Sequence, residues 1–404
     1  MATNNNNKAL NVPHLRFPEF TGEWKETTLD KIAEITKGSG ISKDRLSEYG
    51  SPCILYGELY TKYKSEIINE VYSRTELDSS LLVKSKANDV IIPCSGETAI
   101  DISTARCVPF NNILLGSDLN IIRLKYDDGG FFAYQLNGVR KKDIACVAQG
   151  VSVVHLYGEN LKQIRVYYPA IEEQKKITHL LSLIDERIAT QNKIIEDLKK
   201  LKSAIVDMLL CNQNSEMLKL GDIGYFVRGL TYANEDVTEN KAATAVIRAN
   251  NLNYGNHVDK GEVVYVSRTP ATSQILRKGD IVICMANGSS ALVGKNSYYP
   301  FNDGQSTVGA FCGIYRTSHP LAKWLMQSQR YKRLVYQSLQ GGNGAIANLN
   351  GDDILNMSFP VMEKEKSKSI IFILEAIEKS LAVNKDLQRS YSTQKSHLLK
   401  QMFI

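Results

Sequence analysis

The chain contains two copies of one long sequence pattern, and the second copy lies about 191 to 193 residues after the first. Both copies open on a Leu-x-x-Ile run, and both later carry an aspartate followed by three branched apolar residues. The matching segments, first copy before second, are 28–32 and 219–223, 88–92 and 279–283, and 164–169 and 355–360. This period is much longer than a solenoid unit, so it predicts a duplicated domain, with each copy followed by a helix.

The length and composition are those of an ordinary globular protein. The 404 residues allow two or three domains, and 43% hydrophobic residues are enough for normal cores. No run approaches the roughly 18 apolar residues of a membrane span, and the Asn-rich start at residues 1–7 lacks the apolar core of a signal peptide. We therefore expect no membrane association and a cytoplasmic location. The net charge of +6 is compatible with a polyanionic partner but does not establish one.

The cysteines give no sign of a disulfide framework or a metal site. The seven cysteines are an odd number, they are widely scattered, and no two form a C-x-x-C pair. They are Cys53, Cys94, Cys107, Cys146, Cys211, Cys284 and Cys312. The sequence predicts reduced thiols and no bound metal.

Two textures alternate along the chain. Residues 24–169 and 213–361 mix short apolar runs with turn signals, which predicts two α+β modules. Residues 170–212 and 362–404 repeat apolar residues at spacings of three and four, which predicts two long amphipathic helices. Residues 1–23 are left as an N-terminal arm. Since the second helix has no further module to reach, it is expected to return antiparallel along the first, giving a pseudo-twofold arrangement of two modules separated by the helices.

The alternative is that each helix packs against its own module. The residues predicted to pack between the helices are Ile184, Ile188, Ile195, Leu198, Ile205, Ile377, Leu381 and Leu398.

Catalytic motifs are absent from the sequence. There is no G-x-x-x-x-G-K-[ST] phosphate loop, no G-x-S-x-G elbow and no H-E-x-x-H pair, and the six histidines are dispersed. The glycines of Gly341–Gly344 lack the strand, helix and acidic residue of a dinucleotide site, so they predict a loop. We therefore propose no catalytic residue.

Loops rich in glycine, amides and hydroxyls follow corresponding runs in both copies. Asn and Gln side chains can read base edges, glycine lets the backbone approach the sugar-phosphate chain, and Lys and Arg contact phosphate or guanine. The DNA-binding candidates are Lys37, Ser39, Lys84, Lys86, Ser95, Gln149 and Ser152 in the first module, and Arg228, Arg248, Asn250, Asn251, Arg277, Asn287, Ser289 and Asn343 in the second. Any one of them taken alone is more often an ordinary turn or surface residue.

Four segments carry a resemblance to a known family. They are residues 11–18 (NVPHLRFP), 168–177 (YPAIEEQKKI), 183–188 (LIDERI) and 398–403 (LLKQMF). Together they resemble the specificity subunit of type I restriction-modification systems, and the resemblance extends over essentially the whole chain. The helix lead-in is the most specific part. The second copy departs from it, because residues 361–370 (VMEKEKSKSI) replace the EEQKKI form and make the alignment about two residues longer.

The resemblance implies a noncatalytic subunit of an adenine-N6 DNA methyltransferase and restriction complex. Each module would be a target-recognition domain that reads one half of a bipartite sequence in double-stranded DNA. The helices would set the spacer between the half-sites and dock two modification (methyltransferase) subunits. Restriction (motor-nuclease) subunits would complete the assembly. The partners, and not this chain, would hold S-adenosylmethionine, ATP and Mg.

Two other classes of function remain open at this point. In the first, one module is a nuclease, and Asp89, Glu97 and Asp280 are metal ligands, although no D-x(n)-E-x-K array surrounds them. In the second, the chain is a scaffold whose modules bind proteins. The salt dependence of DNA affinity separates a DNA reader from a scaffold, because phosphate contacts release counterions.

Overall fold

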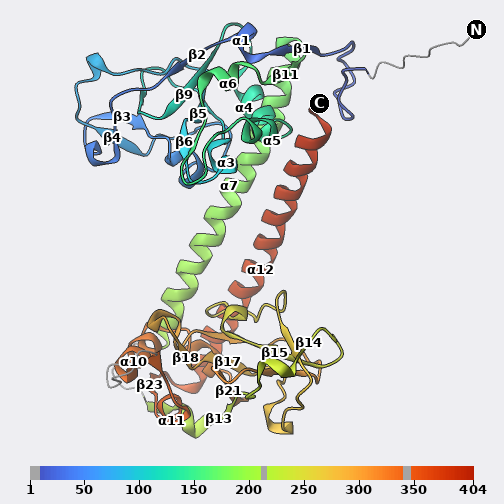
Figure 1. Ribbon diagram of the computed structural model, residues 1–404. Helices are drawn as coiled ribbons and strands as arrows, with labels where there is room; N and C mark the ends of the chain where they lie inside the picture. The colour runs from blue at the N-terminus through green and yellow to red at the C-terminus, as the bar shows by residue number, and fades with distance from the viewer. Residues whose placement is uncertain (1–9, 211–215, 340–346) are drawn as a thin grey trace, which may run out of the picture. The chain divides into compact units, whose positions relative to one another are not determined.

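The computed structural model describes residues 10–210, 216–339 and 347–404, and these form two compact units (Figure 1). The first unit contains the chain up to Lys193 together with Lys385–Ile404, and the second unit contains Ile194–Asn384. Two helices of 38 residues contribute to both units, α7 (Ile171–Met208) and α12 (Lys364–Gln401).

The first unit is built on an antiparallel sheet of order β2-β9-β5-β7, beside a three-stranded sheet of order β4-β3-β8. The strands are β1 (Lys25–Thr28), β2 (Ala33–Lys37), β3 (Ser51–Ile54), β4 (Ser73–Thr75), β5 (Asp89–Pro93), β6 (Ser95–Gly96), β7 (Arg106–Val108), β8 (Leu114–Leu115), β9 (Leu119–Leu124), β10 (Val154–His155) and β11 (Arg165–Tyr168). The shorter helices are α1 (Leu29–Ile32), α2 (Glu58–Thr61), α3 (Ala99–Ile102), α4 (Gly129–Asn137), α5 (Lys141–Cys146) and α6 (Gly158–Lys162). Strands β1 and β11 pair where the chain enters and leaves the unit.

The second unit repeats this plan with a β13-β21-β17-β19 sheet and a β14-β16-β15-β20 sheet. The strands are β12 (Glu216–Lys219), β13 (Gly224–Arg228), β14 (Val237–Thr238), β15 (Thr244–Ile247), β16 (Val264–Val266), β17 (Ile281–Cys284), β18 (Ala286–Asn287), β19 (Asn296–Tyr298), β20 (Ser306–Val308), β21 (Cys312–Thr317), β22 (Ala347–Asn348) and β23 (Ser358–Val361). The helices are α8 (Leu220–Ile223), α9 (Ala322–Leu325), α10 (Gln329–Leu339) and α11 (Gly351–Leu355). The α+β class predicted from the sequence is confirmed.

Strand register corrects one part of the sequence match. Thr28 faces Arg165 across β1 and β11, and the corresponding Lys219 faces Ser358 across β12 and β23. Arg165 is therefore equivalent to Ser358, whereas the sequence match paired it with Asn356 and was wrong by two residues. The extra residues of the second copy lie between β17 and β21, upstream of this strand, so the match had to be shifted before it reached β23.

A pair of glycines occupies the same place in both units. A Cβ on Gly38 would lie 2.1 Å from the carbonyl oxygen of Gly116, and a Cβ on Gly229 would lie 2.1 Å from that of Gly309. Each pair brings two backbone segments together just beyond β2 or β13. No side chain fits at Gly38 or Gly229, so these two glycines hold the strand ends close to the neighbouring loop.

We expect Gly229→Ala to lower the free energy of unfolding by about 1–3 kcal/mol, because the backbone must move to admit the methyl group. Gly288→Ala is the matched control, since its Cβ would meet nothing within 4 Å. Urea denaturation of the two variants measures the difference. Equal urea midpoints for the two variants would show that the backbone at Gly309 can move without loss of stability.

A buried ion pair is also duplicated. Arg123 contacts Asp89 at 2.7 Å in the first unit, and Arg316 contacts Asp280 at 2.6 Å in the second. In both units the carboxylate also accepts the backbone N–H of the residue three positions earlier. The duplication therefore extends to side-chain contacts as well as to strand order.

The end of a long helix closes each core. Met402 and Phe403, which follow α12, are buried in the first unit, where the Phe403 ring lies 5.2 Å from that of Phe131. Val206 and Leu209, at the end of α7, are buried in the core of the second unit. These apolar ends anchor the helices to the cores, so both long helices are integral parts of the units.

The two long helices pack antiparallel. In the second unit Ile195, Ile377 and Leu381 form one apolar cluster, with Leu198 and Ile205 packed against it. In the first unit Ile184 is buried, Ile188 is half-buried, and Leu398 packs against the domain core. Both packing arrangements considered from the sequence therefore occur. One part of the apolar stripe of the helices packs on the other helix, and another part packs on the domain core.

An ion pair within the second unit adds a polar link between the helices. Lys202 of α7 donates to Glu378 of α12 at 2.8 Å, and Lys323 pairs with the same carboxylate. Burial by itself raises the pKa of Glu378, but the two lysines outweigh burial and hold its pKa below the ordinary value.

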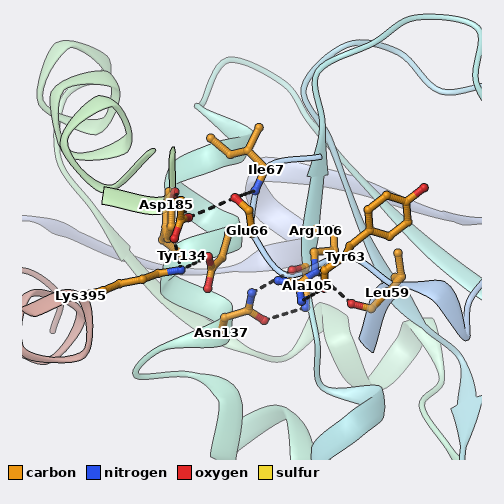
Figure 2. A network of polar contacts seen from close by, with 11 residues as sticks. Leu59, Tyr63, Glu66, Ile67, Ala105, Arg106, Tyr134, Asn137, Asp185 and Lys395 are labelled. Carbon is orange, nitrogen blue, oxygen red and sulfur yellow. Dashed lines mark hydrogen bonds and ion pairs between the residues drawn. The ribbon is translucent and has the colours of Figure 1, made fainter. Parts of the chain in front are cut away.

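A second polar link joins both helices to the first unit's domain, as Figure 2 shows. Lys395 of α12 contacts Asp185 of α7 at 2.6 Å and also pairs with Glu66, from the loop before β4. The Asp185 carboxylate accepts a hydrogen bond of 2.7 Å from the Tyr134 hydroxyl and one of 3.1 Å from Ser65. All three charged side chains are largely buried, so this network fixes the C-terminal part of α12 on the domain.

Two further expectations concern chemistry and location. The six cysteines within the described residues are all free thiols, and Cys211 lies outside those residues. None of the helices in the described part of the chain is long and apolar enough to span a membrane.

Candidate nucleic-acid interface

Strand ends of the second unit gather several DNA-binding candidates on one edge. Arg228 ends β13, Arg248 follows β15, and Asn287 ends β18. They line two adjacent hollows. The Arg248 hollow, of about 670 Å³, is lined by residues that include Tyr232, Arg248, Asn250, Asn287 and Phe311. The Arg228 hollow, of about 260 Å³, is lined by residues that include Phe226, Arg228, Phe311, Asn348 and Asn350.

Polar groups in these hollows face solvent with unused hydrogen-bonding capacity. The guanidinium groups of Arg228 and Arg248 bond to no other described residue. Asn287 accepts the N–H of Ser289 through its Oδ1, which leaves its amide NH₂ for a ligand. No carboxylate is among the described residues that line either hollow. Two arginines in hollows that no described carboxylate lines form a positively charged edge, suited to a polyanion.

Asn251 belongs to the scaffold of this edge. Its side chain is buried, its Oδ1 accepts the N–H of Arg248 at 2.9 Å, and its amide donates to the carbonyls of Asp259 and Glu262. These three hydrogen bonds hold the Asn251 side chain inside the unit, where it positions the backbone of Arg248.

The structure separates other candidates from this edge. Arg277 precedes β17, whereas the hollows lie beyond the opposite end of that strand. Lys84 and Lys86 likewise precede β5, and Ser95 follows it. A strand of four or five residues spans about 13–17 Å, so these groups do not act together at one point. Asn343 lies outside the described residues.

The remaining DNA-binding candidates differ in how far their side chains are exposed to solvent. Ser95 is buried, and Ser39 is half-buried with its hydroxyl accepting the N–H of Val83 at 3.2 Å. Lys37, Gln149 and Ser152 are exposed in the first unit, as are Asn250 and Ser289 in the second.

The first unit presents different side chains on the same frame. The N–H of Cys94 donates to the carbonyl of Asp118, and the N–H of the equivalent Met285 donates to that of Phe311, which makes Asp118 and Phe311 equivalent. The other equivalent pairs, by strand register and turn contacts, are Lys37 and Arg228, Leu55 and Arg248, Gly57 and Asn250, Gly96 and Asn287, and His155 and Asn348. Where the second unit has the Phe311 ring, the first unit has an acid, and two of the exposed rings of the first unit, His155 and Tyr157, stack at 6.2 Å.

Sequence reasoning missed the aromatic residues of this edge. Phe311 and Tyr232 line the Arg248 hollow, but neither was among the candidates. Phe311 precedes an apolar strand, where an aromatic residue is usually core, and the search was restricted to charged, amide and hydroxyl side chains. Its only signal was position, because it lies two residues after Gly309, whose carbonyl approaches Gly229.

Two of the three carboxylates considered for a nuclease pair with arginines. Asp89 and Asp280 are buried in ion pairs with arginines, and Glu97 is exposed. No group of three or more His, Cys, Asp or Glu residues within the described ranges is placed to hold a metal ion.

Comparisons with known proteins agree with the fold and the segments described above. Residues 21–200 match the family described as type I restriction modification DNA specificity domain. Two relatives are the type I restriction enzyme specificity subunits EcoKI of Escherichia coli (strain K12) and StySPI of Salmonella potsdam. Each is 29% identical over 150 residues, which are 35% of this chain and 31% of the relative. Residues 21–200 thus resemble a type I DNA specificity domain. The match covers less than a third of each relative's length.

Solved structures extend the likeness to both units. The S subunit of a type I restriction-modification system from M. genitalium has a TM-score of 0.62 at 17% identity, over 97% of this chain and 99% of that one. A structure titled for the complex assembly and conformational transition of the type I R-M system has a TM-score of 0.53 at 14% identity, over 94% of this chain and 97% of that one. At these identities the likeness shows a shared fold. The prediction of a specificity subunit agrees with the names of these relatives.

Proposed function

We propose that this chain is the sequence-recognition subunit of a type I restriction-modification complex and that its two units read the two halves of a bipartite DNA target. The observation that carries the proposal is the pair of equivalent edges, one in each unit. Apart from the additional strand β14 of the second unit, the frames match in strand order, yet Asp118 replaces Phe311 and Leu55 replaces Arg248. One frame with two sets of contact groups suits two different half-sequences.

The proposed division of the chain follows from this role. Residues 24–169 and 213–361 are the target-recognition domains, and residues 170–212 and 362–404 are the spacer helices. The helices set the distance between half-sites, since each is a continuous α-helix of 38 residues, roughly 57 Å at 1.5 Å per residue.

The helices also dock two modification subunits in this proposal. Ile194, Leu201 and Met208 lie seven residues apart on α7 and are exposed, as are Phe372 and Val383 on α12. A heptad of exposed apolar residues suits a partner helix, because only a partner would remove this surface from water. Methyl transfer and DNA cleavage, with S-adenosylmethionine, ATP and Mg, belong to the modification and restriction subunits.

The direct test is to co-express the chain with its modification subunits in a methylation-free host and map modified adenines across the genome. A single bipartite motif with a fixed gap supports the proposal. A contiguous motif contradicts the proposal that each unit recognises one half of a bipartite target. An assembled complex that binds its methyl donor but modifies no DNA favours the scaffold function.

Removing seven residues from the middle of α7 and seven from the middle of α12 tests the spacer role. A heptad deletion keeps the apolar stripe in phase and shortens each helix by about 10 Å, or about three base pairs. We expect the gap to shorten while both half-sequences stay the same. Changed half-sequences with an unchanged gap would contradict the role of the helices.

A further inference from the structure

Phe311 forms a ridge between the two hollows of the second unit. Its side chain is 67% exposed and lines both the Arg248 hollow and the Arg228 hollow. An arginine thus lies on each side of one exposed ring. An exposed Phe leaves its apolar surface in water, and a partner that covers the ring would remove this surface from water.

The backbone holds this ring in place. The Phe311 carbonyl accepts hydrogen bonds from Met285 at 2.8 Å and from Ala286 at 3.2 Å. The N–H of Cys312 donates to the Gly309 carbonyl at 2.8 Å, which closes a turn around the residue. Because Gly309 also packs against Gly229, the turn has little freedom. The side chain therefore projects from a fixed point and needs little ordering when it binds.

The groups around the ridge match the chemistry of base edges. Arginine binds guanine O6 and N7, asparagine binds adenine N6 and N7, and a Phe ring contacts the thymine methyl group. Arg248 and Asn287 lie on one side of Phe311, and Arg228 and Asn348 on the other. Contacts of these three kinds on one edge suit neighbouring base pairs in the major groove.

We propose that Phe311 is a specificity-determining residue of the second unit, contacting base edges in one half-site between the flanking contacts of Arg228 and Arg248. This inference rests on the proposed function. In the first unit Asp118 takes the equivalent place, and a carboxylate accepts from cytosine N4 and not from a methyl group. The same point of the frame therefore reads different bases in the two half-sites.

The test uses the full chain assembled with its modification subunits and compares adenine methylation maps of the wild type, Phe311→Ala and Phe311→Asp. We expect Phe311→Ala to relax base preference about tenfold at one or two adjacent positions of one half-site. Phe311→Asp is expected to shift the preference at the same positions. The other half-site and the gap stay unchanged. Arg248→Ala is expected to affect the same half-site, and His155→Ala the other one.

Tyr336→Ala is the matched control, because this ring is 65% exposed on α10 and lines neither hollow. The proposal is overturned if Phe311→Ala and Tyr336→Ala give the wild-type motif alike, or if Phe311→Ala weakens both half-sites equally. It is also overturned if both Phe311 variants assemble normally yet methylate nothing, since a base contact changes preference without abolishing methyl transfer. A wild-type complex that yields no bipartite motif would instead contradict the proposed function itself.

Discussion

Replacing Lys395 by methionine is expected to lower the free energy of unfolding of the first unit by about 3–5 kcal/mol, the usual cost of breaking a buried ion pair from one side. The lysine pairs with Glu66 and with Asp185, and the three side chains are 13%, 9% and 6% exposed. Methionine keeps the apolar stem but leaves two buried carboxylates without their cation. The C-terminal part of α12 should then separate from the domain more readily.

The loss should depend on pH, and the sign follows from Glu66. Burial raises the pKa of Glu66 above its ordinary value, although Lys395 opposes this. A carboxyl whose folded pKa is raised adds stability below its unfolded pKa, and this contribution is lost as the pH rises through the folded pKa. Without Lys395 the pKa of Glu66 rises further, because the opposing charge is gone. The defect should therefore be largest at neutral pH and smaller in acid.

The two tryptophans allow each unit to be followed separately, since Trp24 is buried in the first and Trp324 in the second. In a Trp324→Phe background, urea unfolding followed by fluorescence reports the first unit. Lys395→Met/Glu66→Gln should recover part of the loss, because one unpaired charge is removed. Lys400→Met, at an exposed position of the same helix, is the control. Equal midpoints for Lys395→Met and Lys400→Met would contradict this account.

The architecture could be predicted from local patterns in the sequence, but the pairing of residues that are far apart in the sequence could not. Apolar spacing within a helix predicts an amphipathic segment, so both long helices were found. The residues around β23 were misaligned by two, because matching apolar letters do not reveal which residue of β12 each one faces. Lys395 stands in a polar part of its helix, and nothing near it in sequence indicates Glu66, 329 residues away.

The sequence indicated candidate residues by their type, and the structure shows where in the fold each of them lies. Arg228, Arg248 and Asn287 were chosen as cationic and amide groups, and the fold brings them to one edge. Arg277 was chosen for the same reason, but it lies at the other end of β17. Residue type says nothing about which end of a strand a group occupies. Phe311 was missed because no local pattern distinguishes an exposed ring from a core one.

The sequence allowed Asp89 and Asp280 to be considered as metal ligands, because the arginines that pair with them are far away in sequence and could not be identified. The arginines that pair with them follow 34 and 36 residues later. Since both units form the same Arg–Asp pair, the contribution of the pair to stability can be compared between the two units. The pairs differ in burial: the Arg316 and Asp280 side chains are 9% and 3% exposed, and those of Arg123 and Asp89 are 26% and 2% exposed.

We expect Arg316→Met to lower the free energy of unfolding of the second unit by about 3–5 kcal/mol, because Asp280 would be left charged and buried. Arg316 also donates to the carbonyls of Ser273 and Ile275 at 3.0 and 2.7 Å, so the substitution leaves those oxygens without their donor. Its bonds to Asp280 raise the pKa of Arg316, so the guanidinium stays charged.

Arg123→Met should cost the first unit clearly less, since Arg123 is more exposed and water can reach the vacated site beside Asp89. Urea unfolding in a Trp24→Phe background follows the Arg316 variant through Trp324, and the reverse background follows the Arg123 variant. Arg316→Met/Asp280→Asn should recover part of the loss, because it removes the unpaired charge. If the two single variants cost the same, burial does not set the strength of this duplicated pair; if neither has an effect, the pair does not stabilise the two units.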